Sequence, residues 1–233
     1  TWVFQVISGG LQVTGMNRPV YWGIFIMSFI YFIGLSHAGT LISAILRVTD
    51  ASWRRPLTRI AEAITVFVLF IGAGMVIWDV GRPIRALLYL PLHGRFQSPL
   101  VWDFAAITTY LTMSISFLYV AMIPDIAHVR DRLKRGRWVY DILALGFQGT
   151  KRQWEQYERS MFLLSVAVIP VAVSVHTVVS FIFSMEPKPM WHETIFGPFF
   201  VTGALFSGVA AIIVSMFLIR RYYHLEEYLN PRL

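Results

Sequence analysis

Five ionisable residues lie within long apolar stretches of this sequence, where such residues are rare: His37, Glu62, Asp79, Asp103 and His176. A charged side chain at the centre of a bilayer costs roughly 3 kcal/mol on insertion scales, so residues of this kind usually carry protons, ions or a polar substrate headgroup. Carboxylates and imidazoles both accept and release protons. Proton transfer is therefore the first chemistry that these residues suggest.

The composition is that of a membrane protein. Of the 233 residues, 56% are hydrophobic and only 14% are charged, whereas a soluble domain has about 25% charged residues. The chain has no cysteine, so it cannot ligate an iron–sulfur cluster through thiolates or attach a c-type haem. Such a redox centre has to belong to a partner. The net charge of +7 does not indicate nucleic-acid binding, because the basic residues cluster between the apolar stretches.

About 20 apolar residues span a bilayer as a helix, and five stretches are long enough. These are Pro19–Leu46, Ile60–Val80, Pro99–Ile123, Ser160–Met185 and Ile195–Ile219. The sequence therefore predicts an all-α integral membrane fold with five transmembrane helices. We expect an interfacial segment at residues 1–18, a four-helix transmembrane bundle at 19–185, and a fifth helix with a cytoplasmic tail at 186–233.

The basic residues predict the orientation of these spans. We call the side on which the first span begins side A, and the opposite side is side B. Side A holds five basic residues, Arg18, Arg82, Arg85, Arg95 and Lys188, so fifteen of the twenty Lys and Arg residues are left for side B. Cytoplasmic loops carry the excess of Lys and Arg. We therefore expect the loops 47–59 and 124–159 to be cytoplasmic and side A to be periplasmic or extracellular.

The rise of 1.5 Å per helical residue converts sequence position into depth. Asp79 and Asp103 lie near side A, followed in depth by His176, then His37, then Glu62 near side B. This order forms a candidate proton path across the membrane. The alternative is a set of separate interfacial residues and two neutral histidines that are hydrogen-bonded to the backbone. The two histidines differ by about 10 Å in this count, which argues against a shared haem.

The side A carboxylates have neighbours that suit a quinol. Arg82 follows Asp79 by three residues, and His93 and Trp102 lie on the same rim. Aromatic residues at membrane interfaces are usually anchors. Apolar and aromatic walls with a few polar groups also suit a ligand with an apolar tail and a polar, redox-active head. We expect Asp103 and Asp79 to act catalytically as proton acceptors, and these two with Arg82, His93 and Trp102 to bind the headgroup.

Four motifs occur in an order typical of one family: residues 34–43 (GLSHAGTLIS), 79–83 (DVGRP), 98–103 (SPLVWD) and 174–180 (SVHTVVS). The chain resembles the NrfD/polysulfide-reductase membrane-subunit family from about Asn17 to Phe206. It is most similar to the quinol-oxidising membrane subunit of bacterial alternative complex III. In this resemblance Asp103 matches the aspartate that is proposed for the quinol site.

The resemblance implies a subunit of the bacterial cytoplasmic membrane with no redox cofactor of its own. Its substrate would be a quinol, with menaquinol expected. Its partners would be an iron–sulfur protein subunit, multihaem cytochrome c subunits, a homologous membrane subunit and lipids. Family members have eight to ten spans, so the chain is expected to be part of a larger subunit. Proton translocation would be a further role of such a complex.

The chain departs from the family at two positions. The position of Asp79 is often His in relatives from alternative complex III, and the position of Ile182 often carries Asp. The loss at Ile182 leaves open a structural membrane anchor whose quinone site no longer works. The ionisable residues within the spans leave open a proton or ion transporter. No metal site is expected in either case.

Overall fold

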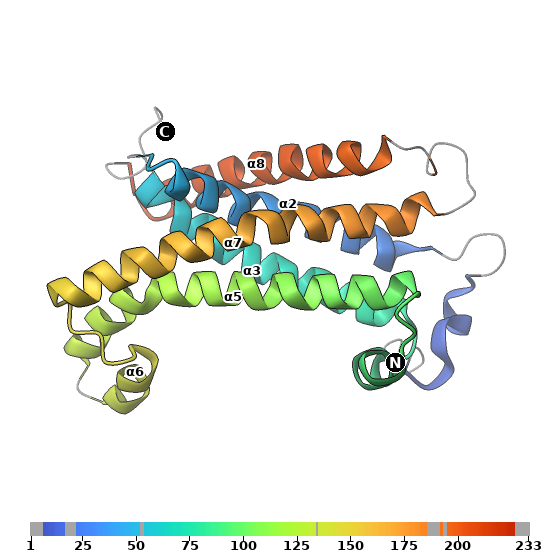
Figure 1. Ribbon diagram of the computed structural model, residues 1–233, viewed down its shortest axis with the longest axis horizontal. Helices are drawn as coiled ribbons and strands as arrows, with labels where there is room; N and C mark the ends of the chain where they lie inside the picture. Colours follow the sequence, from blue (N-terminus) through green and yellow to red (C-terminus); the bar gives the residue numbers. More distant parts are fainter. Residues whose placement is uncertain are drawn as a thin grey trace.

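The computed structural model describes residues 7–16, 22–51, 54–133, 135–185, 192 and 195–226, with only the backbone of Val13, Arg55 and Pro56. Its elements are η1 (Gly10–Thr14), α2 (Ile24–Val48), α3 (Arg54–Asp79), η2 (Arg85–Tyr89), α4 (Leu90–His93), α5 (Pro99–Arg132), α6 (Arg137–Leu143), α7 (Lys151–Ser184) and α8 (Phe196–Tyr222). η1 is a 3₁₀ helix and η2 is a π-helix. Every regular element in the described ranges is helical, as the sequence predicts (Figure 1).

Five of these helices are long and apolar enough to cross a membrane: α2, α3 from Leu57, α5, α7 and α8. The prediction of five spans is confirmed. The prediction of a single loop at 124–159 is wrong in part, because α5 continues through Pro124 to Arg132 and α7 begins at Lys151. Hydropathy detects only the apolar part of a helix. Thr150 and Gln153 form a capping box that starts α7 well before its apolar part.

The first four spans form a closed bundle. α2 packs against α3, α3 against α5, α5 against α7, and α7 against α2. α8 lies outside this ring and packs against α2 and α7 (Figure 1). Side A is at the right of Figure 1 and side B at the left. Of the interfacial segment predicted at 1–18, only residues 7–16 are described, and its membrane contact stays a prediction.

α2 is the central helix of the molecule. In one apolar stretch of 18 consecutive residues of α2, 67% of the residues are buried, against 17% in the corresponding stretch of α8. Glycines allow its neighbours to approach this closely. A Cβ added at Gly39 would collide with the backbone of Ala61 in α3, and one added at Gly208 of α8 would collide with Ala38. These two contacts fix α2 between α3 and α8.

Apolar side chains fill the bundle in two main clusters. The cluster toward side A includes Phe29, Leu69, Ile107, Val179 and Phe183. The cluster toward side B includes Phe117, Ala121, Tyr157, Met161 and Val168. The first cluster lies next to the side A carboxylates, Asp79 and Asp103, so closely packed apolar side chains hold this end of the bundle in place.

Ion pairs join the helices at side B. Arg47 pairs with Glu158, Arg59 with Asp125, and Arg130 of α5 with Asp141 of α6. Each exposed pair contributes only about 0–1 kcal/mol to the stability of the fold. The main effect of these pairs is to hold the side B ends of the helices next to one another. α6 lies beside the end of α5, where the Tyr119 hydroxyl donates to the carbonyl of Leu143. Its Trp138 and Ile142 are exposed.

The close approach of α2 and α3 predicts a sharp difference between two glycine substitutions. We expect Gly39→Ala to lower the free energy of unfolding by about 1–3 kcal/mol, because the added methyl group has no space. Gly203→Ala in α8 is the matched control. Its added methyl group meets no atom within 4 Å, and Ala is favoured over Gly in a helix by about 0.5–1 kcal/mol. Thermal unfolding in detergent measures both, and equal stability of the two variants would contradict the packing described.

Candidate functional site

Two carboxylates lie at the side A end of the bundle on neighbouring helices. Asp79 is the last residue of α3, and Asp103 is the fifth residue of α5, which begins at Pro99. Because these helices run in opposite directions, their end and their start meet on one side. Asp103 is only 6% exposed. Among the described residues, the Oδ1 atoms of both carboxylates have no hydrogen-bond partner.

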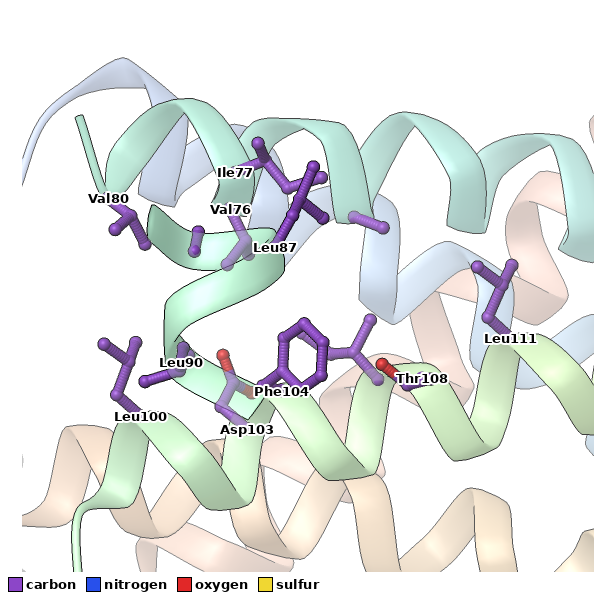
Figure 2. A pocket seen from close by; sticks show the side chains of 13 residues that line it. Val76, Ile77, Val80, Leu87, Leu90, Leu100, Asp103, Phe104, Thr108 and Leu111 are labelled. Atoms are coloured by element: carbon purple, nitrogen blue, oxygen red, sulfur yellow. The ribbon is translucent and has the colours of Figure 1, made fainter. Parts of the chain in front are cut away.

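A cavity of about 300 Å³ lies between α3, the η2–α4 segment and α5. We call it the lateral cavity. Figure 2 shows Asp103, Phe104 and Thr108 projecting from α5 toward the side chains of η2–α4 and α3. Its lining residues are Ala73, Val76, Ile77, Val80, Ala86, Leu87, Leu90, Leu100, Asp103, Phe104, Ile107, Thr108 and Leu111. Only Asp103 and Thr108 in this lining have polar side chains.

A second cavity, of about 320 Å³, lies inside the bundle. We call it the central cavity. Its lining residues are Trp22, Ile26, Phe29, Val76, Asp79, Val80, Ser98, Pro99, Leu100, Asp103, Val179, Ile182 and Phe183. Both carboxylates line this cavity, as the sequence led us to expect from their matching depth. Ile182 lines it too, so the position where the resemblance implies a further aspartate belongs to the same place.

The two cavities share one wall. Val76, Val80, Leu100 and Asp103 line both of them. Asp79 lines only the central cavity. Asp103 is therefore the one ionisable side chain, among the described residues, that contacts both spaces.

The other predicted headgroup ligands lie outside both cavities. Arg82 is exposed and, within the described part of the chain, makes no ion pair with Asp79. His93 is exposed and stacks on Tyr89 with ring centroids 4.7 Å apart. The Nε1 of half-buried Trp102 donates to the carbonyl of Phe96 at 2.5 Å. These three residues surround the site and do not line it. Trp191 and Glu193, also expected at this rim, lie outside the described residues.

His37 and His176 are in direct contact. Their ring centroids are 3.9 Å apart, and neither side chain has any exposed surface. None of the four ring nitrogens has a hydrogen-bond partner of normal geometry among the described residues. The backbone of Ala172 and of Ile33 lies close to the His176 ring.

This contact corrects the predicted 10 Å difference in depth between the two histidines. A helical side chain leans toward the N-terminus of its own helix. α2 runs from side A to side B, so His37 leans toward side A; α7 runs the opposite way, so His176 leans toward side B. The two side chains therefore lean toward each other. Counting residues from the helix ends gives only the depth of the backbone.

Glu62 lies deeper toward side B in a separate polar environment. It is 2% exposed, and its Oε1 accepts a hydrogen bond from the Ser43 hydroxyl. His37 and Ser43 are six residues apart on α2, about 9 Å along the helix. The three members of the predicted proton path therefore form a contacting pair and a separate carboxylate.

Hydroxyl groups that sequence reasoning overlooked occupy the space between these two parts. The carbonyl of Ser36 accepts hydrogen bonds from Thr65 Oγ1 at 2.9 Å and from the Tyr110 hydroxyl at 3.0 Å. Thr40 and Ser114 are buried in the same polar core. Tyr110 lies two turns after Asp103 on the same face of α5. The seven-residue spacing from Asp103 is a signal that could have pointed to Tyr110 from the sequence alone. It was missed because Ser, Thr and Tyr are so common in apolar helices that a single hydroxyl group does not attract attention.

The described residues offer no metal or haem site. No group of three or more His, Asp or Glu side chains within the described ranges is arranged to hold a metal ion. A haem iron held by two histidines needs the macrocycle between their rings. The contact between His37 and His176 leaves no space for it, so the geometry of this pair does not fit a haem.

The chain matches a sequence model of the family described as "Polysulphide reductase, NrfD" over residues 12–229. It is 28% identical, over 95% of its length, to a protein of Halobacterium salinarum that is named as a putative membrane subunit of dimethyl sulfoxide reductase. It is 26% identical, over 89% of its length, to a protein of Mesobacillus selenatarsenatis that is named as a subunit of selenate reductase.

A third relative is the "Hdr-like menaquinol oxidoreductase integral membrane subunit" of Archaeoglobus fulgidus, which is 21% identical over 98% of the chain. The chain covers 48%, 50% and 49% of these three relatives. It therefore spans about half the length of the curated relatives it matches. All three names describe subunits of oxidoreductases.

Proposed function

The chain belongs to the NrfD polysulphide reductase family, and from this premise we propose that it binds and oxidises a quinol within a respiratory or photosynthetic oxidoreductase complex. The observation that carries the proposal is the carboxylate of Asp103. It is buried, it has an oxygen that finds no hydrogen-bond partner among the described residues, and it lines two cavities at one end of the bundle. A buried, unpaired carboxylate is unfavourable for stability, which favours a functional role for this side chain.

Quinol oxidation removes two protons and two electrons from the headgroup. Asp103 is placed to accept a proton from a quinol hydroxyl, which is general-base chemistry. The electrons pass to a redox centre of a partner subunit. A cysteine-ligated iron–sulfur cluster has to be held by that partner, because this chain has no cysteine.

The family resemblance and the distribution of charge support a more specific proposal for the kind of complex, its quinol, its partner subunits and the membrane side of the site. We propose a subunit like that of alternative complex III, with menaquinol as the substrate and with iron–sulfur, multihaem cytochrome c and homologous membrane subunits as partners. The name of the Archaeoglobus relative includes a menaquinol oxidoreductase, which supports this quinol class. The Lys and Arg excess at side B supports a cytoplasmic location for that side and a periplasmic site.

A proton path toward side B is a second role that one observation favours. His176 contacts His37 inside the bundle, and the buried hydroxyl groups of Tyr110 and Thr65 lie between this pair and Glu62. Chains of His, Glu and Asp are typical of proton relays in membranes. We propose that this polar core moves further protons between side B and the site, apart from the two that the quinol releases.

We expect Asp103→Asn to lower quinol oxidation at least about tenfold, because an amide cannot act as a base. The amide has nearly the same shape, so the complex should still assemble. The measurement is quinol oxidation by the purified complex, with the composition of the complex determined in the same preparation. Asp50→Asn, at the exposed side B end of α2, is the control.

Unchanged turnover in Asp103→Asn would sink the proposed catalytic role. If the wild-type complex also showed no saturable quinol binding, the chain would be a structural anchor. Ion flux through the protein in liposomes without quinone would instead favour a transporter.

For the proton path, we expect Glu62→Gln to reduce the number of protons moved per electron by at least about half. The amide still accepts the Ser43 hydrogen bond but cannot release a proton. The complex is reconstituted in liposomes, and proton movement is followed together with quinol oxidation. Glu155→Gln, an exposed residue of α7, is the control, and an unaltered proton-to-electron ratio in Glu62→Gln would exclude the path.

A further inference from the structure

The two cavities at side A differ in the chemistry of their walls. The lateral cavity has apolar walls apart from Asp103 and Thr108. The central cavity contains both carboxylates and the hydroxyl group of Ser98. Asp103 is the only polar side chain common to the two linings. This division suggests that the cavities hold different ligands.

The lateral cavity opens on the outer surface of the molecule. Leu87 of η2 and Thr108 of α5 line this cavity and not the central one, and both are exposed, Leu87 to 48%. Because α5 is one of the candidate membrane spans, its exposed face at Thr108 contacts the hydrocarbon region. A volume of about 300 Å³ is at the lower end for small-molecule pockets. The cavity therefore suits a ring headgroup whose apolar tail stays between lipid chains.

The central cavity lies within the bundle and ends at the side A surface. Its deep walls are Phe29, Val179 and Phe183, each at most 2% exposed. Its other end is formed by the end of α3 at Asp79 and by the N-cap of α5 at Ser98. The volume of about 320 Å³ is enough for several water molecules of about 30 Å³ each. The two carboxylates in the cavity wall can hydrogen-bond such water molecules.

We propose that the two cavities divide the reaction. The quinol ring occupies the lateral cavity, while the central cavity is a water-filled proton exit that leads from Asp103 past Asp79 to side A. This inference rests on the proposed quinol oxidation and changes the predicted role of Asp79. Asp79 receives protons and does not touch the headgroup, because it lines only the central cavity.

Each step balances in atoms and charge. The O–H bond of the quinol breaks, and the proton forms a new O–H bond with the Asp103 carboxylate. Asp103 then gives this proton to water in the central cavity and so to Asp79, which releases it to the water at side A. Both carboxylates are then ready for the second proton. The two electrons leave to the redox centre of a partner subunit. The quinone that remains returns to the lipid on the lateral side.

Selective obstruction of each cavity tests the division. Ala73 and Ala86 line only the lateral cavity, whereas Asp79 and Ile182 line only the central cavity. We expect Ala73→Leu to raise the KM for menadiol, a short naphthoquinol, at least about fivefold in the purified complex. Ala86→Leu, on a different element, replaces it if Ala73→Leu does not assemble. Ala105→Leu, an exposed residue of α5 outside both linings, adds the same volume as a control and should change nothing.

We expect Asp79→Asn and Ile182→Phe to lower kcat at least about fivefold with KM within twofold of the wild-type value. Formate supplies a small proton carrier that fits a water-filled space. It should restore a large part of the turnover of Asp79→Asn, which it could not do for a merely structural defect. The composition of the complex is measured for every variant.

Two results would overturn the division. One is a rise in KM for Asp79→Asn as large as that for Ala73→Leu, which would make Asp79 a headgroup ligand. The other is normal turnover in Asp79→Asn while Asp103→Asn is impaired, which would leave the proposed function intact and remove the proton exit. Normal turnover in Asp103→Asn would instead remove the proposed function itself.

Discussion

The contact between α2 and α3 at Gly39 is the constraint on which the rest of the structure depends. It brings Thr65 close enough to donate to the carbonyl of Ser36, and Tyr110 of α5 donates to the same carbonyl. Three helices are therefore held together at one backbone oxygen near mid-membrane. Since α3 carries both Glu62 and Asp79, its position against α2 fixes the polar core and the side A site at once.

The surrounding bilayer makes the burial of these ionisable groups costly. No water is available in the hydrocarbon region to hydrogen-bond an unpaired group. Yet within the described part of the chain, the carboxylate of Asp103 and the rings of His37 and His176 are buried with polar atoms that have no hydrogen-bond partner. Apolar packing from Phe29 to Phe183 surrounds them and stabilises the fold around them. Stability therefore comes from the helix contacts, and the ionisable groups are available for chemistry.

The sequence predicted the spans well because the length and apolarity of a helix are local properties. It also placed Asp79 and Asp103 together, since both lie at helix ends on one side. It failed for His37 and His176, because the lean of a side chain depends on helix direction. It could not show that Arg82, His93 and Trp102 lie outside the cavities. It could not separate two cavities either, because η2 and α4 were expected to be a loop, and their Ala86, Leu87 and Leu90 form one wall.

The length of α5 and α7 has a consequence for the architecture of a complex. Each has 34 residues, which is about 51 Å of helix, while a bilayer with its headgroups is about 40–45 Å thick. If both helices stand near the membrane normal, roughly one to two turns project beyond the headgroups at side B. Any protein that contacts the side B ends of α5 and α7 is therefore held at least this far from the lipid surface, whereas α6 lies back along α5, where the Tyr119 hydroxyl donates to the carbonyl of Leu143.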